Sequence, residues 1–192
     1  MRKLIAAMKV SLDGKMEGPE GVADWAESWS EDYGLMPQID ACVLGNGMYG
    51  GYERYWTSIQ NEPGTPAWIT GNPPTPAEIA WAAFIKRTPH YVLSITRTEA
   101  QWPDTRFLRG IDEIAALKRQ PGKDIYVAGG GRMVTSLIDA GLLDELRLLV
   151  YPLIAGDGRA LFATLEKRAA LKLLKAKALP AGRTSLVYEL GS

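Results

Sequence analysis

Residues 124–134 read Asp-Ile-Tyr-Val-Ala-Gly-Gly-Gly-Arg-Met-Val, and the rest of the chain is best understood outward from this stretch. The run from Ile125 to Ala128 is short, apolar and rich in β-branched residues, which is typical of a buried parallel strand. Beyond the glycines, Val134, Leu137 and Ile138 fall at helical spacing, and Gly141 is placed to end the helix. The stretch therefore predicts a strand, a glycine turn and a helix.

Three adjacent glycines at such a turn allow a ligand to approach the main chain. The following helix begins with free N–H groups and the positive end of its dipole, and both suit a phosphate group. Two interpretations stay open on this evidence. The turn either holds a phosphate-bearing ligand or is a tight connection with no ligand at all.

The composition predicts a single globular domain over residues 1–192 that binds a small molecule. Of the 192 residues 46% are hydrophobic, and 22 basic side chains balance 22 acidic ones. This balance gives no global field for nucleic acid or an anionic membrane. No apolar segment reaches the roughly 20 residues that a membrane span needs, and Cys42 is the only cysteine. A cytoplasmic protein without disulfides is expected.

Further strands and helices can be placed along the chain. Strands are expected at residues 3–10, 40–44, 91–95, 105–108, 145–154, 171–179 and 184–190, and helices at 25–35 (capped by Asp24), from about 48 to 56, at 78–87 and at 112–118 (capped by Asp112). Strands alternate with helices in the front of the chain and stand alone at the back. This order predicts an α/β fold with a mostly parallel sheet, helices on both faces and antiparallel strands at the C-terminus.

Three strand ends carry glycine, hydroxyl or arginine side chains: residues 45–47, 94–97 and 129–132. In an open α/β sheet, ligands bind beyond the carboxyl ends of parallel strands. An elongated anion such as a dinucleotide has the length and the charge to contact all three. The usual dinucleotide fingerprint is not met, because Val134 stands where its third glycine belongs.

These pieces resemble the dihydrofolate reductase-like superfamily, in particular the C-terminal reductase domain of bifunctional riboflavin-biosynthesis proteins. The matching segments run almost end to end: residues 4–14 (ending Ser-Leu-Asp-Gly), 43–49, 92–97, 125–134 and 142–162. The three-layer fold of that superfamily is therefore expected.

The resemblance implies a reductase that binds NADPH. The residues implied to hold the cofactor are Gly45, Asn46, Gly47, Met48, Tyr49, Ser94, Thr96, Arg97, Gly129, Gly130, Gly131, Arg132, Met133 and Val134. Ser94, Thr96 and Arg97 are implied to meet the adenosine ribose and its 2′-phosphate. The family often has arginine where this chain has Asn46, so one cationic contact is missing and the choice between NADPH and NADH stays open. The implied substrate is a small heterocycle or carbonyl compound, for example a pyrimidine or pteridine of riboflavin or folate chemistry, as in a 5-amino-6-(5-phosphoribosylamino)uracil reductase.

A reduced C=N or C=O bond also needs a proton. Asp13, in the Ser-Leu-Asp-Gly segment, is the predicted catalytic acid, and its alternative is a turn-forming role ahead of Gly14. Glu27, Glu31 and Asp32 are further acids on the expected first helix. Trp25 is the predicted substrate contact, with core packing as its alternative.

Other chemistries fit the sequence poorly. His90 is the only histidine and has no cysteine near it, so neither a metal site nor a Ser-His-Asp triad is expected. Two rivals to the reductase remain: a non-catalytic nucleotide-binding module and a scaffold protein that dimerises through its C-terminal strands. A homodimer is expected, because the apolar strands 145–154 and 171–179 would otherwise leave unpaired edges or an uncovered face.

Overall fold

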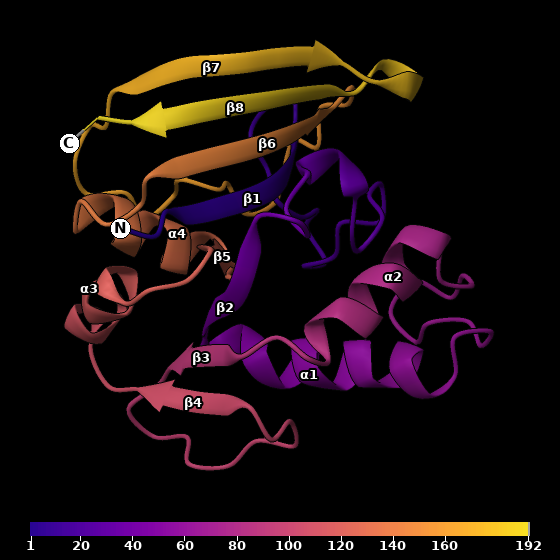
Figure 1. Ribbon diagram of the computed structural model, residues 1–192. Coiled ribbons are helices and arrows are strands. Elements are labelled where there is room, and N and C mark those ends of the chain that lie inside the picture. Colours follow the sequence, from indigo (N-terminus) through magenta and orange to yellow (C-terminus); the bar gives the residue numbers. More distant parts are fainter. Residues whose placement is uncertain (192) are drawn as a thin grey trace.

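One eight-stranded sheet runs through the computed structural model, which describes residues 1–191 (Figure 1). Its strands are β1 (Leu4–Ser11), β2 (Ile39–Gly45), β3 (His90–Leu93), β4 (Thr105–Leu108), β5 (Asp124–Val127), β6 (Glu145–Tyr151), β7 (Leu171–Ala178) and β8 (Thr184–Leu190). They lie in the order β4-β3-β2-β5-β1-β6-β8-β7. The first six strands in this order are parallel, and β8 pairs antiparallel with both β6 and β7. The expected mixed sheet is thus confirmed, and β6 belongs to its parallel part.

Helices cover both faces of the sheet. They are α1 (Asn46–Asn61), α2 (Pro76–Ile85), α3 (Ile111–Arg119) and α4 (Gly131–Asp139). Figure 1 shows α1 and α2 on one side and α3 and α4 on the other. In β1, Ile5 and Ala7 pack into the core beneath α1 and α2, whereas Leu4 and Ala6 pack into the core beneath α3 and α4. Successive side chains of a strand point to opposite faces, so a strand buried on both faces must be apolar throughout.

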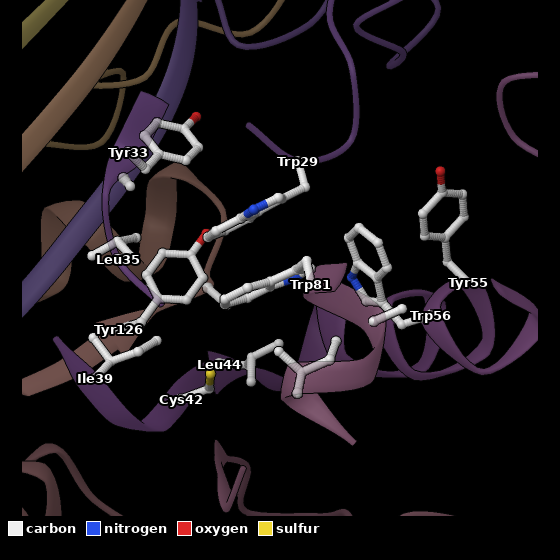
Figure 2. Close-up of a cluster of buried hydrophobic side chains, with 14 of the residues drawn as sticks. Trp29, Tyr33, Leu35, Ile39, Cys42, Leu44, Tyr55, Trp56, Trp81 and Tyr126 are labelled. Atoms are coloured by element: carbon white, nitrogen blue, oxygen red, sulfur yellow. The ribbon is translucent and has the colours of Figure 1, made fainter. Parts of the chain in front are cut away.

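Residues 25–35 do not form the expected helix. The described backbone has only a 3₁₀ turn, Glu31–Tyr33, which begins at Ser30 and ends at Gly34 in the left-handed conformation. The cause is Trp29, whose ring stacks on Trp81 of α2 with centroids 3.5 Å apart, as Figure 2 shows. Burial of this large ring makes an irregular backbone path over α2 more stable than a helix that faces solvent.

The C-terminal hairpin extends the sheet beyond the helices. The expected strand at 145–154 ends at Tyr151, because Pro152 has no N–H for the ladder. β7 forms the far edge of the sheet and is exposed along its whole length. Among residues 1–191 no helix is long and apolar enough to cross a membrane.

Candidate functional site

A cavity of about 1470 Å³ opens beside the carboxyl ends of β1, β2 and β5. Its walls come from β1, the β2–α1 and β5–α4 turns, the segment from Met16 to Ser28, and the loop before α2. The β1–β5–β2 neighbourhood lies where the chain order of the strands reverses. Such switch points are where open α/β sheets bind ligands.

Both glycine turns reach this cavity. Among the residues predicted to hold the cofactor, those that line it are Gly45, Gly47, Met48, Gly129, Gly130, Gly131, Arg132 and Met133. Tyr49 and Val134 are not brought to it. Both are fully buried, and the Tyr49 hydroxyl donates a 2.6 Å hydrogen bond to Glu53 within α1. At helical spacing these two positions fall on the side of the helix that packs on the sheet.

The three adjacent glycines of the β5–α4 turn have different roles. A Cβ at Gly129 would lie 2.8 Å from the Met133 side chain, and one at Gly131 would lie 2.7 Å from the Leu161 carbonyl. Close packing therefore requires glycine at both positions. A Cβ at Gly130 would meet nothing within 4 Å, and the same is true at Gly47 in the other turn. Their backbones face open space that a ligand can enter.

Two helices begin at the cavity without a cap. α1 starts from Gly45 and α4 from Gly130, neither start has a capping side chain, and neither first turn contains an acid. By contrast, the Thr75 hydroxyl and the Glu78 carboxylate cap α2 reciprocally. The uncapped N–H groups and the positive ends of two helix dipoles thus face one cavity. This arrangement attracts an anion.

A second, smaller cavity of about 400 Å³ lies past the end of β3 and is lined by Asn46, Ser94, Thr96 and Arg109. The β2–α1 turn thus presents Asn46 here and its glycines to the large cavity. Arg97 does not line the small cavity. Its Nε donates a 2.9 Å hydrogen bond to Asn46 Oδ1, and its guanidinium stands 5.5 Å from the centroid of the Tyr49 ring.

Arg109 is a site residue that the sequence reasoning missed. It follows β4, and its Nη1 donates hydrogen bonds to the Ser94 carbonyl at 2.5 Å and the Arg97 carbonyl at 3.0 Å. The sequence signal that could have found Arg109 was its position directly after an expected strand. The same kind of position drew attention to the other three strand ends. The expected cap of α3 by Asp112 is also corrected, because the Glu113 carboxylate accepts the Arg109 and Gly110 N–H groups instead.

Asp13 lies away from the large cavity. Its carboxylate accepts hydrogen bonds from the Ser11 hydroxyl at 2.6 Å and from the backbone N–H groups of Ala155 and Gly156, each at 3.0 Å. These bonds, the Ser11 hydroxyl first, lower the pKa of Asp13 to about 2. A carboxylate so committed to its anionic form is a poor proton donor at neutral pH. This geometry favours the turn-forming role that was the alternative for Asp13.

Lys9 is the ionisable group that β1 does present to the cavity. Burial lowers the pKa of its ammonium to about 8, and Glu27 and Glu78 oppose that shift through space. A charged side chain in an otherwise apolar central strand was the signal in the sequence. The pKa of Lys9 lies in the range that suits a general acid near neutrality.

Glu27, one of the three acids considered on the expected helix, also lines the cavity. Burial by itself raises the pKa of Glu27, but the Tyr151 hydroxyl, Lys9 and Arg183 stabilise the anion and hold the pKa below its ordinary value. Arg183 Nη1 lies 3.0 Å from the carboxylate. Glu27 is therefore an anion that steadies the charge of Lys9, and neither Glu31 nor Asp32 lines the cavity.

Trp25, the predicted substrate contact, lines the cavity and is half-buried. Its indole Nε1 is buried without a hydrogen-bond partner among residues 1–191. Trp29, by contrast, belongs to the core. Trp25 also packs against the edge of the same core, so both of its expected roles stay open.

Comparison with known proteins identifies the family. The RibD C-terminal domain family matches residues 2–184. The uncharacterised protein YyaP of Bacillus subtilis (strain 168) is 31% identical over 192 residues, with 97% of this chain and 94% of that protein covered.

Solved structures share the fold. A putative riboflavin biosynthesis protein from Shewanella sp. PV-4 superposes with a TM-score of 0.71 at 21% identity, with 99% of both chains covered. Dihydrofolate reductase from Enterococcus faecalis, solved with NADP(H), gives a TM-score of 0.63 at 15% identity, with 99% of this chain and 97% of that one covered.

Proposed function

This chain belongs to the RibD C-terminal domain family, and from that premise we propose that it is a reductase that takes hydride from NADPH to reduce a small heterocyclic or carbonyl substrate. The observation that carries the proposal is the pair of uncapped helix starts, Gly45 of α1 and Gly130 of α4, which open on one cavity. The charge of an elongated anion with two phosphates complements the two positive helix ends. The open backbone at Gly47 and Gly130 leaves room for it.

The chain's own residues supply binding and orientation, and the cofactor supplies the hydride. In this proposal the N–H groups that begin α1 and α4 hold the pyrophosphate. Met48, Arg132 and Met133 line the same part of the cavity. Ser94, Thr96 and Arg109, in the smaller cavity, hold the adenosine end. Arg109 takes the place that the sequence gave to Arg97, because Arg109 is the cation that lines this cavity.

Lys9 is proposed as the catalytic acid. Its side chain lines the cavity, and its lowered pKa leaves it protonated at neutral pH and yet ready to release the proton. Glu27, held by Tyr151 and Arg183, keeps an anionic partner beside the ammonium. Proton transfer leaves a neutral amine on Lys9, and the burial that lowers its pKa favours this uncharged form.

A homodimer is part of the proposal. Leu171 pairs with Leu190 and Leu173 with Tyr188 across the β7–β8 ladder, so these four side chains share a face. Leu171 and Leu173 are 41% and 51% exposed. A second copy that packs on this face would cover it and the free edge of β7.

The test is a spectrophotometric assay of NADPH oxidation with a panel of pyrimidines, pteridines and small carbonyl compounds. Oxidation that requires both the chain and one of these compounds is the expected result. Saturable NADPH binding with no turnover across the panel would favour the non-catalytic nucleotide-binding module. Absence of NADPH binding would favour the scaffold protein.

A further inference from the structure

The part of the large cavity away from the glycine turns is here called the substrate end. It consists of Lys9, the residues of segment 16–28 that line the cavity, residues 68–75 of the loop before α2, and Glu78. Its character can be read from the charges and the apolar side chains that line it, and the inference below rests on the proposed reductase function.

Acidic side chains outnumber basic ones at the substrate end. The acids that line it are Glu17, Asp24, Glu27 and Glu78, and the single lysine is Lys9. Glu78 is buried, and its two carboxylate oxygens accept hydrogen bonds from the N–H groups of Ser28 and Thr75 at 2.9 and 2.8 Å. The two hydrogen bonds fix the position of the Glu78 carboxylate beside the cavity.

Two arginines near the substrate end, Arg159 and Arg183, are paired with carboxylates. Arg159 Nε lies 2.6 Å from Glu17 Oε1, and both residues line the cavity. Arg183, behind Glu27, is shared between Glu27 at 3.0 Å and Asp32 at 3.4 Å. A phosphate monoester bound here would bring close to two negative charges into a cavity end where carboxylates outnumber the lining lysine.

The opening of the substrate end is apolar. Val22, Trp68 and Ile69 are exposed by 45%, 52% and 46%, although all three are hydrophobic, and they line the cavity together with Trp25. The guanidinium of Arg54 lies 4.8 Å from the centroid of the Trp68 ring and holds that ring in the loop. Exposed apolar surface beside a cavity favours a ligand that covers it.

We propose that the substrate is a flat, phosphate-free heterocycle or carbonyl compound whose outer part is apolar. It inserts between Trp25 and Trp68 with its reducible bond toward Lys9. The carboxylates repel a phosphorylated substituent, and the tryptophans bind an aromatic or aliphatic one. This substrate preference would distinguish the chain from a reductase that acts on a phosphoribosyl compound. The cofactor part of the cavity is compatible with both kinds of reductase.

Three probes that differ stepwise test the proposal on the full chain saturated with NADP⁺, so that a phosphate cannot enter the cofactor part of the cavity. Lumichrome is a bare three-ring heterocycle, riboflavin adds a ribityl chain, and flavin mononucleotide adds a phosphate to that chain. Dissociation constants come from flavin or tryptophan fluorescence. Lumichrome should bind at least roughly tenfold more tightly than flavin mononucleotide, with riboflavin between them.

Two variants assign the effect to the substrate end. Trp68→Ala should weaken lumichrome binding by roughly tenfold or more, as the loss of one stacking face does. Phe162→Ala is the matched control, because Phe162 is 39% exposed and does not line the cavity. It should leave the affinity unchanged.

Binding of NADP⁺ is measured first, since its absence would overturn the proposed function and this inference together. With NADP⁺ bound, two results overturn the inference alone. One is flavin mononucleotide binding as tightly as lumichrome or more tightly. The other is no lumichrome binding at all.

Discussion

Nε of Arg97 donates a hydrogen bond to Oδ1 of Asn46 over 2.9 Å, and this bond joins the segment after β3 to the first residue of α1. An arginine at position 46 would place two guanidinium groups side by side. With asparagine there, the side chain of Arg97 has a hydrogen-bond acceptor in Asn46, and its guanidinium lies over the Tyr49 ring. Arg109 is left as the cation that lines the small cavity.

Arg109→Ala is expected to erase most of the preference for NADPH over NADH. A guanidinium holds phosphate through charge-assisted hydrogen bonds of about 1.5–3 kcal/mol each, so the preference should fall roughly tenfold to a hundredfold. Dissociation constants for both cofactors test this. Arg106→Ala is the control, because Arg106 is an exposed cation of β4 that does not line the cavity. If Arg97→Ala erases the preference and Arg109→Ala does not, the original assignment from sequence is right and this one is wrong.

Turnover should depend on the protonation of Lys9. With a pKa of about 8, its ammonium is present below pH 8 and is lost above it, so kcat/KM should be level at lower pH and fall above about 8. Lys9→Met should lower kcat by roughly 10²–10⁴ and remove this decline, while NADPH affinity changes little. A profile for Lys9→Met that still falls near pH 8 would show that another group supplies the proton.

Asp13→Asn should retain turnover within a few-fold of the parent and lower the melting temperature at pH 7. The carboxyl pKa is depressed to about 2, so its stabilising contribution is present above its ordinary pKa and is lost as the pH falls through about 2. At pH 7 that contribution is complete, and asparagine cannot replace the anion. Steady-state kinetics and thermal melts separate the two roles. A large loss of kcat with an unchanged melting temperature would restore Asp13 as the acid.

Leu173→Glu should convert a dimer to a monomer. A carboxylate on the shared apolar face of β7 and β8 would have to be buried unpaired, which costs several kcal/mol. Lys172→Gln is the control, since Lys172 points to the opposite face and pairs with Glu189. Light scattering at micromolar concentration gives the oligomeric state of both variants and of the parent. A monomeric parent contradicts the proposed dimer.

The fold could be predicted from the sequence because its signals are local. The run from Ile125 to Ile138 has an apolar strand segment, a glycine turn and a helical spacing in succession, and the structure places all three as expected. Residues 25–35 were misassigned because their path is set by Trp29 meeting Trp81, fifty-two positions away. No local propensity reports such a contact.

The site could be predicted only in part, for the same reason. Glycines that precede helices favour an anion site and can be recognised in the sequence, and eight of the expected cofactor residues line the large cavity. Lys9 and Arg109 could not be assigned to the cavities from local sequence, because their positions depend on the strand order. β1, which carries Lys9, lies at the centre of the sheet, and β4, which precedes Arg109, lies at its edge. Asp13 was favoured by a motif, yet its partners Ala155 and Gly156 come from the other end of the chain.

Gly130 allows a direct test of whether NADPH binds across the β5–α4 turn. Its φ of −74° suits any residue, and a Cβ there meets nothing within 4 Å, so Gly130→Val should fold normally and place its side chain where the cofactor lies. Gly51→Val, on the exposed face of α1, is the control. A fluorescence titration should give saturable NADPH binding to the parent and to Gly51→Val, and at least roughly tenfold weaker binding to Gly130→Val, about 1.4 kcal/mol. Equal affinity for all three chains, or no saturable binding to the parent, would contradict the account.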